Sequence, residues 1–394
     1  MKILHTADWH LGASLNNAKR YHEFNAMLDF LLDLIRKEQI PCVIVAGDIF
    51  DVPVPPNRAI ELYYRFLTGC AVAGVRHCII IAGNHDSPSF IEAPKELLKR
   101  LNVHVFGSFD REDPASHLID LDGEAVVLAL PFLHERDVRT SLSGETYNEQ
   151  RSALQQGTIE TYRALTALAK EKYPALPLIA TGHFWAVEKE GEAEPVGNTH
   201  PIPLCDFPPE IGYLALGHIH GGYPVIPTGY YSGSPLPMKF GEAEKEKCVL
   251  IVETNHLSAP PQIITLPVFQ PMKTLCGNME EIAAQIAELA KNDTGIWLRV
   301  ENTGAFQPNL RTDLLDLIKG TKLELISCGN REPNPAILRR TVATEKLSEL
   351  TPETVFQRLL AQQEIPEEEQ DDLLNAFRLA EETLRIAERE EKAE

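Results

Sequence analysis

The sequence predicts an α/β fold built around a mainly parallel sheet. Short apolar segments alternate with segments of helical periodicity three times before residue 86, which is typical of βαβ units. The apolar segments are rich in β-branched residues, as expected of strands that are buried on both faces. Polar residues also follow several of these segments directly, and an open α/β sheet binds its ligands at the carboxyl ends of its strands.

The first third of the chain provides the clearest elements. Apolar residues recur at helical spacing between Phe24 and Ile35 and predict a helix that covers the sheet. Gly83 ends an apolar run and marks the end of a central strand. The expected strands are 2–7, 42–46 and 77–82, and the expected helices are 21–38 and about 57–73.

The middle of the chain adds further strands and one long helix. We expect strands at 125–130, 176–181, 213–216, 223–231 and 247–253, and a helix at 150–172. The stretch from Gly191 to Pro209 is rich in proline and glycine and is long for a loop, which indicates either a functional or a mobile segment.

Composition limits the function classes. The 394 residues suffice for two or three domains, and contents of 44% hydrophobic and 24% charged residues are typical of a soluble globular protein. The seven cysteines are odd in number and never in CxxC spacing, which argues against a disulfide framework or a zinc knuckle and favours a reducing compartment. Since we expect neither a signal peptide nor a membrane span, the predicted location is the cytoplasm.

The net charge of −20 is unusual for a simple DNA-binding module, which would carry a basic face. Part of this charge lies in the tail, because residues 345–394 contain 15 Asp and Glu against 6 Lys and Arg. A site built from carboxylates also requires cations, and bound divalent ions reverse the local field. The charge is therefore compatible with a nucleic-acid substrate.

Five strand ends carry side chains that bind metals. A single histidine after a strand is usually an ordinary loop residue, but five such coincidences in one order are poorly explained by chance. In four of the five, a glycine directly precedes the first polar residue and leaves room for close approach. The mixture of carboxylate, amide and imidazole without thiolate suits a pair of Mn²⁺, Fe²⁺ or Zn²⁺ ions. The residues are Asp8 and His10, Asp48, Asn84 and His85, His183, and His218 and His220.

These motifs, D-x-H, GD, GNHD, GH and GHxH in this order, resemble the calcineurin-like metallophosphoesterases and, within them, the Mre11/SbcD nucleases. Three further segments narrow the resemblance: Thr6–Gly12, Tyr231–Pro237 and Leu347–Pro352. The resemblance covers nearly the whole chain and is weakest over 184–210 and 270–335. It implies a metallophosphoesterase β-sandwich flanked by helices (1–265), a small α/β capping domain (270–335) and C-terminal amphipathic helices (345–394).

The resemblance also implies roles for the individual residues. One metal would be held by Asp8, His10 and His220, the other by Asn84, His183 and His218, and Asp48 would bridge the two. His85 would stabilise or protonate the leaving oxygen, with Asp86 orienting its ring. For Asp51, a ligand role is the alternative to a loop or capping carboxylate, and we favour the second.

The implied activity is that of a nuclease subunit dependent on two Mn²⁺ ions. Such a pair lowers the pKa of a shared water, which attacks phosphorus in line. The expected substrates are DNA 3′ ends, cleaved by an exonuclease activity, and single strands and hairpins, cleaved by an endonuclease activity. The alternative is a stand-alone metallophosphoesterase that acts on small phosphodiesters or phosphoproteins.

The last third of the chain indicates partners. In the region 270–335 we expect helices near 280–290 and 310–318 and strands near 296–300 and 323–326. The sequence alone favours neither a capping domain nor a plain packing module there, and Arg299, Arg311 and Lys322 fit contacts to a DNA backbone and solvated surface charges equally well. Amphipathic stripes after Thr351 and Pro366 would pack within the chain or bind an SbcC-type ATPase, as the resemblance implies. The sequence contains no GxxxxGK[ST] loop, so any ATP dependence requires another chain. The resemblance further implies a homodimer, formed through helices of the first third, within a heterotetramer.

Overall fold

The computed structural model describes residues 1–138, 147–189, 201–331, 356, 373, 374 and 377. The chain divides into two compact units, Met1–Arg331 and Glu332–Glu394. The strands and helices with assigned bounds all belong to the first unit.

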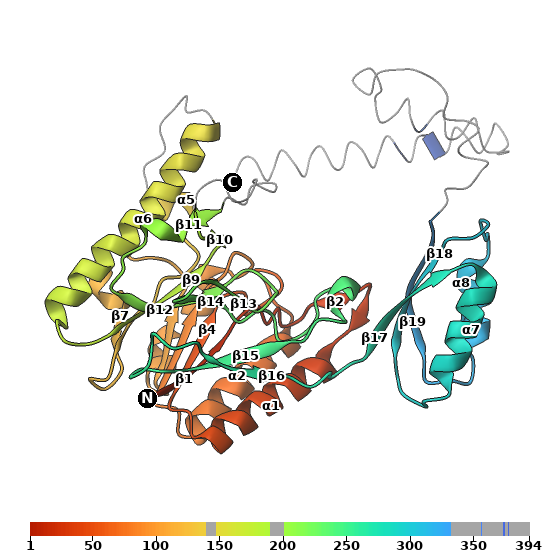
Figure 1. The fold of residues 1–394 in the computed structure, drawn as a ribbon, viewed down its shortest axis with the longest axis horizontal. Coiled ribbons are helices and arrows are strands. Elements are labelled where there is room, and N and C mark those ends of the chain that lie inside the picture. The colour runs from red at the N-terminus through yellow and green to blue at the C-terminus, as the bar shows by residue number, and fades with distance from the viewer. Residues whose placement is uncertain (139–146, 190–200, 332–355, 357–372, 375–376, 378–394) are drawn as a thin grey trace. The chain divides into compact units, whose positions relative to one another are not determined.

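The first unit contains two six-stranded sheets (Figure 1). In sheet one the neighbours β1, β4, β5 and β6 are parallel, and β15 pairs antiparallel with β1 and β16. Its order is β16 (Gln262–Thr265), β15 (Cys248–Glu253), β1 (Lys2–Thr6), β4 (Cys42–Ala46), β5 (His77–Ile81) and β6 (Val103–Phe106).

Sheet two has the same plan, with a parallel centre and antiparallel edges. The neighbours β14, β12, β9 and β8 are parallel, whereas β13 and β7 are antiparallel to the strands beside them. Its order is β13 (Tyr223–Ile226), β14 (Gly229–Tyr231), β12 (Ile211–Gly217), β9 (Leu178–His183), β8 (Val126–Leu128) and β7 (Leu118–Asp120).

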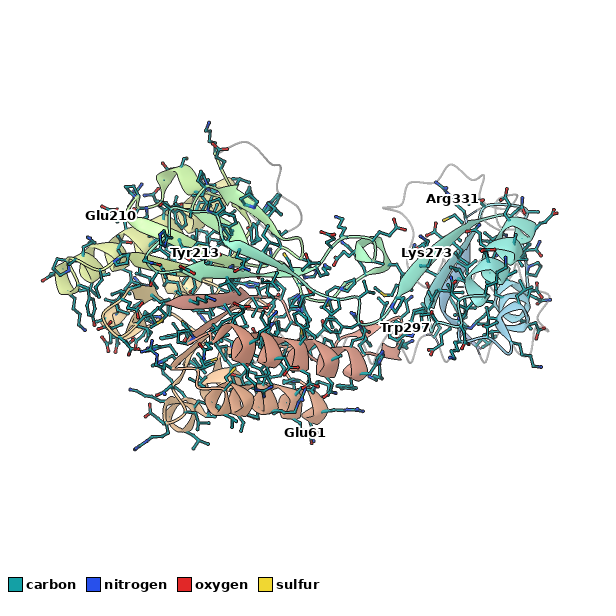
Figure 2. The ribbon with its side chains drawn as sticks, turned by 60° about the horizontal axis from the view of Figure 1, so that its bottom comes forward. Glu61, Glu210, Tyr213, Lys273, Trp297 and Arg331 are labelled. Carbon is teal, nitrogen blue, oxygen red and sulfur yellow. The ribbon has the colours of Figure 1, made fainter. Side chains whose placement is uncertain are left out.

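The two sheets pack face to face and helices cover their outer faces. Alternate residues of the central strands point in opposite directions, so Ile44 of β4 enters the layer between the sheets while Val43 and Val45 face the helices. Helices α1 (Tyr21–Glu38) and α2 (Asn57–Val72) cover sheet one, and α6 (Tyr147–Lys172) covers sheet two (Figures 1 and 2). The predicted β-sandwich flanked by helices is confirmed.

Short elements fill the connections between the strands and the long helices. The segment 201–209, predicted only as part of a long loop, contains β11 and η2, and residues 190–200 lie outside the described residues. The short elements are β2 (Ser14–Leu15), β3 (Ala18–Lys19), α3 (Pro88–Glu92), α4 (Lys95–Lys99), η1 (Pro114–His117), α5 (Glu135–Val138), β10 (Ala186–Val187), β11 (Ile202–Pro203), η2 (Leu204–Asp206) and η3 (Phe240–Glu242).

The remainder of the first unit is a small α/β unit, residues 272–330. Its three parallel strands are β17 (Met272–Gly277), β18 (Trp297–Asn302) and β19 (Glu324–Asn330), and its helices are α7 (Met279–Ala290) and α8 (Leu310–Ile318). Asn278 begins α7 with a capping box in which the Glu281 side chain accepts from the Asn278 N–H. The predicted helices and two strands are present, and β17 was missed.

The predicted tail helices lie almost entirely outside the described residues. Within the second unit, the rings of Phe356 and Phe377 stack with centroids 4.3 Å apart, so one residue from each predicted apolar stripe contacts the other. Among the helices that the structure describes, none is long and apolar enough to cross a lipid bilayer.

Candidate metal centre

The predicted ligands gather at one edge of the sandwich, where β1, β4 and β5 of sheet one and β9 and β12 of sheet two end. We call this the carboxyl edge. Backbone hydrogen bonds tie its loops together: the N–H of Asp8 donates to Gly47 O at 3.0 Å, and that of His10 donates to Asp48 O at 3.0 Å. Across the two sheets, the His218 N–H donates to the Asp8 carboxylate at 2.9 Å. The loops therefore form one connected structure.

Four of the seven predicted ligands have a backbone in the left-handed region. Their φ angles are 52° for Asp8, 47° for His10, 51° for Asp48 and 96° for His218. Residues other than glycine rarely adopt positive φ, and when they do they are concentrated at functional sites, because the surrounding structure must compensate the strain. The sequence patterns gave no sign of this conformation.

The glycines before the polar residues are required by close approach. A Cβ on Gly83 would lie 2.1 Å from Oδ1 of Asp48, and a Cβ on Gly47, whose φ is +89°, would lie 2.2 Å from Nδ1 of His183. Any larger residue at either position would displace a predicted ligand. This agrees with the role that the sequence suggested for these glycines.

The first predicted ligand trio is brought together. Ligand atoms of Asp8, His10 and His220 all lie within 4.8 Å of one another. The Nε2 atoms of His10 and His220 face each other at 3.2 Å. Asp8 and His10 are buried, and His220 is half-buried.

The second predicted trio also converges. Oδ1 of Asn84 lies 3.2 Å from Nε2 of His183 and 2.9 Å from Nδ1 of His218. Asp48 lies between the trios, because its Oδ2 is 3.5 Å from Nε2 of His10 and 3.3 Å from Nε2 of His183. The Asp48 carboxylate is therefore close to an imidazole of each trio.

The carboxylates and imidazoles of this cluster shift one another's pKa values. Burial alone would raise the pKa of the Asp48 carboxyl, but His183 and His10 hold it well below its usual range, so Asp48 is ionised at neutral pH. Burial opposes a charge on His183 in turn, yet the carboxylate of Asp48 raises the pKa of His183 to about 9. Burial, with a smaller effect of His183, lowers the pKa of His218 to about 4, and the neutral imidazole is the form that coordinates metals.

The donor set fits divalent transition metals. His183 Nδ1 donates to the Ala46 carbonyl at 2.8 Å, so Nε2, which faces Asp48 and Asn84, is the ring nitrogen that remains for a cation. Nδ1 of His10 is buried and makes no hydrogen bond of regular geometry among the described residues, with Oδ1 of Asp51 3.5 Å away. Carboxylate, amide and imidazole donors without thiolate suit Mn²⁺, Fe²⁺ or Zn²⁺, so the residues fit the divalent ions implied by the fold.

His85 lies beside this cluster, with its ring edge-on to that of His10 at a centroid distance of 4.9 Å. The Nδ1 atom of His85 donates to the backbone carbonyl of Asp51 at 2.9 Å. The backbone N–H of His85 donates to Oδ1 of Asp48. The group that orients the His85 ring is therefore the carbonyl of Asp51.

The expected role of Asp86 was wrong. Its carboxylate is buried and accepts hydrogen bonds from the N–H groups of Gly83 at 2.9 Å, Ile49 at 3.1 Å and Phe50 at 2.9 Å, so it does not orient the His85 ring. Adjacent residues in this turn point in different directions. Asp86 instead joins the loop that carries Asp48 to the loop that carries Asn84 and His85.

Asp51 also contacts this cluster. Its Oδ1 lies 3.5 Å from Nδ1 of His10, on the side of the ring opposite Asp48, and its carbonyl holds His85. Ligand atoms of Asp51, His10 and His85 lie within 4.8 Å of one another. In the sequence, the only indication that Asp51 lies near the ligands is its position three residues after Asp48.

An apolar cavity of about 240 Å³ adjoins the second trio. Phe132, Phe184 and Trp185 contribute aromatic surface to its wall, and Asn84, His183 and His218 line its other side. Sequence reasoning did not identify these aromatic residues, because none of them belongs to a ligand motif.

The fold and the site define a class of enzyme. Residues 1–222 match the family model described as calcineurin-like phosphoesterase, and residues 268–364 match the model described as type 5 capsule protein repressor C-terminal domain. The chain is therefore a metal-dependent phosphoesterase of the calcineurin-like class.

Curated relatives narrow this class. The chain is 34% identical to the SbcD subunit of nuclease SbcCD from Escherichia coli K12, over 96% of this chain and 97% of the relative. It is 35% identical to the Rhodobacter capsulatus protein of the same name, over 74% and 77%, and 31% identical to that of Bacillus subtilis, over 65% and 66%. The chain belongs to the SbcD family of SbcCD nuclease subunits.

Proposed function

We propose that the chain is the nuclease subunit of a DNA end-processing complex. It would act as a 3′-to-5′ exonuclease on double-stranded DNA and as an endonuclease on single strands and hairpins. The observation that carries this proposal is the convergence of seven donor side chains at the carboxyl edge, in a chain similar over nearly its whole length to subunits named as nucleases.

We assign two Mn²⁺ ions to this edge. Asp8, His10 and His220 would hold one ion, Asn84, His183 and His218 the other, and Asp48 would contact both. Bound divalent ions would polarise the phosphodiester and generate hydroxide from water at neutral pH. No nucleophilic side chain is required for such a hydrolysis.

His85 is the proposed general acid. Because its Nδ1 donates to the carbonyl of Asp51, Nε2 is the nitrogen that remains for the substrate. As an imidazolium, His85 would donate the Nε2 proton to the leaving oxygen. Asp86 would act indirectly, by fixing the loops that carry Asp48 and His85.

The aromatic cavity supports a nucleic-acid substrate. Base stacking on aromatic side chains tolerates any sequence, and Phe132, Phe184 and Trp185 lie next to the second trio. An unpaired base in this cavity would place its phosphate near the ligands, consistent with cleavage of single strands.

The proposal includes partners. We retain the division into a nuclease domain (1–265), a capping domain (270–335) and a tail (345–394), and propose that the tail binds an SbcC-type ATPase subunit. The relatives are named as one subunit of the SbcCD nuclease, which supports a partner chain. A homodimer formed through α1 and α2 would complete a heterotetramer, with the cytoplasm as its location.

Cleavage of end-labelled double-stranded DNA tests the proposal. The purified chain would be assayed with Mn²⁺ or with EDTA, with and without the ATPase subunit, beside His85→Ala. Shortening of the DNA that needs Mn²⁺ and is lost in His85→Ala is the expected result. Hydrolysis of bis(p-nitrophenyl) phosphate without any DNA cleavage, even with the ATPase subunit, would instead indicate a phosphodiesterase for small substrates.

A further inference from the structure

The outer ring nitrogen of His220 faces a buried carboxylate. Its Nε2 points at His10, whereas its Nδ1 lies 3.5 Å from Oε1 of Glu242, whose side chain is 8% exposed. A neutral imidazole carries its proton on one nitrogen only. A carboxylate at Nδ1 favours the proton there and leaves the Nε2 lone pair for a cation.

Glu242 is itself fixed by a buried ion pair. Its Oε2 lies 2.8 Å from Nζ of Lys247 and accepts from the N–H of Met238 at 3.1 Å. The ammonium of Lys247 compensates the charge of this buried carboxylate.

Lys247 of this ion pair also contacts the backbone of His220. Nζ of Lys247 donates to the His220 carbonyl at 3.1 Å, and the N–H of Ser234 donates to that carbonyl at 3.2 Å. The turn at Gly233, whose φ is +73°, packs so closely that a Cβ would lie 2.9 Å from the same oxygen. Both the ring and the main chain of His220 are therefore held by residues 233–247.

Glu242 lies on η3, which also contacts the small α/β unit. Phe240 is buried in a cluster with Leu15, Met272 and Trp297, the last two from β17 and β18. Just beyond η3, Glu244 pairs with Lys273 of β17 at 2.9 Å. Figure 2 labels Lys273 and Trp297 in the small α/β unit. One residue of this three-residue helix thus packs on the small unit, and another faces a proposed metal ligand.

We propose that Glu242 is a positioning residue for His220, and that η3 links the packing of the small α/β unit to this side of the metal centre. The inference rests on the proposed role of His220 as a ligand. It assigns a function to the segment after Tyr231–Pro237 that no ligand motif covers.

Mn²⁺ affinity of the full-length metal-free chain, measured by titration calorimetry, tests the role of Glu242. Loss of a carboxylate that orients a metal-bound histidine typically weakens binding by about 10–100-fold, and we expect this for Glu242→Ala. Glu242→Gln retains an oxygen that accepts the Nδ1 proton, so it should weaken binding less. The matched control is Glu246→Ala, an exposed glutamate four residues away, which should bind Mn²⁺ as the unmodified chain does.

Thermal unfolding separates positioning from a purely structural role. If Glu242 positions His220, the rise in melting temperature caused by Mn²⁺ will be smaller in Glu242→Ala. If Glu242→Ala lowered the melting temperature equally with and without Mn²⁺, and Mn²⁺ affinity were unchanged, the proposal would be overturned. His220→Ala serves as reference: unchanged affinity there would refute the ligand assignment itself, whereas weakened affinity there with normal affinity in Glu242→Ala would refute only this inference.

Phe240→Ala tests the link to the small unit. This change leaves every proposed ligand and Glu242 in place but removes the ring that anchors η3 on Met272 and Trp297. We expect Mn²⁺ affinity to fall, by less than in Glu242→Ala. Unchanged affinity in Phe240→Ala would show that η3 holds Glu242 independently of the small unit.

Discussion

The two edges of the sandwich differ in how exposed their carboxylates are and in which side chains pair with them. At the amino edge, where the parallel strands begin, the N-terminal amine of Met1 contacts Glu124, and Arg76 contacts Asp122. The side chains of Arg76, Asp122 and Glu124 are 43–50% exposed. Asp122 and Glu124 thus each have a cationic partner and contact with water.

At the carboxyl edge, two buried carboxylates face a group of imidazoles. Asp48 is 2% exposed and lies 3.3–3.5 Å from ring nitrogens of His10 and His183. Asp8 is fully buried, and its ligand atom lies within 4.8 Å of those of His10 and His220. Neutral or partly charged imidazoles satisfy a buried carboxylate less completely than a guanidinium does. The difference between the edges indicates that added cations belong at the carboxyl edge, whereas the amino edge is complete without them.

Of the substitutions considered, removal of the carboxylate between the two trios should have the largest effect on the carboxyl edge. Asp48→Ala takes away the proposed contact to both ions, and the loss of metal stabilisation worth several kcal/mol corresponds to about 10³-fold or more in rate. We expect both Mn²⁺ binding and DNA cleavage to be lost, as measured by calorimetry and by the end-labelled DNA assay. Retention of two tightly bound ions in this variant would contradict the bridging role.

His85→Ala should separate metal binding from catalysis at the same edge. His85 contacts Asp48 through its backbone N–H, which alanine retains, so the ions should stay bound. Loss of a general acid lowers the rate by about 10²–10⁴-fold. The measurement is cleavage rate together with metal content. If His85→Ala and Asp48→Ala lose metal equally, the proposed difference between their roles is wrong.

The positions of helices and strands along the chain were predicted better than the contacts between them. Helix 21–38 and strand 42–46 were predicted at the residues where they occur, because apolar periodicity is a local property. The pairing of β15 with β1 joins residues about 250 positions apart, and no local pattern contains it. Strand β17 was missed because Lys273 and Thr274 interrupt its apolar run.

The candidate ligands were predictable for the same reason, since each lies at or just beyond the end of a predicted strand. What surrounds them was not. Asp86 was assigned to its neighbour in sequence, whereas its carboxylate contacts Ile49 and Phe50, more than 35 positions away. Glu242 reaches His220 only because the chain turns back at Gly233, and the left-handed conformations at the ligands depend on contacts between loops.

Asp86→Ala should weaken the carboxyl edge without removing a ligand. It leaves three buried N–H groups without their acceptor, and each such group costs about 1–3 kcal/mol unless water replaces the bond. We expect a clear loss in the free energy of unfolding, measured with denaturant, and a smaller loss of cleavage than in His85→Ala. A stable variant as inactive as His85→Ala would restore a direct catalytic role to Asp86.

Arg76→Ala should have the smallest effect on stability and activity, and it tests the amino edge. Arg76 is half exposed and pairs with Asp122 and Glu124 at the amino edge. Exposed ion pairs contribute about 0–1 kcal/mol, because water solvates the separated charges well. We therefore expect at most a small change in unfolding free energy and no change in Mn²⁺ affinity or DNA cleavage. If Arg76→Ala lowered Mn²⁺ affinity, the two edges would be coupled through the strands between them, and the carboxyl edge would no longer be an electrostatically separate site.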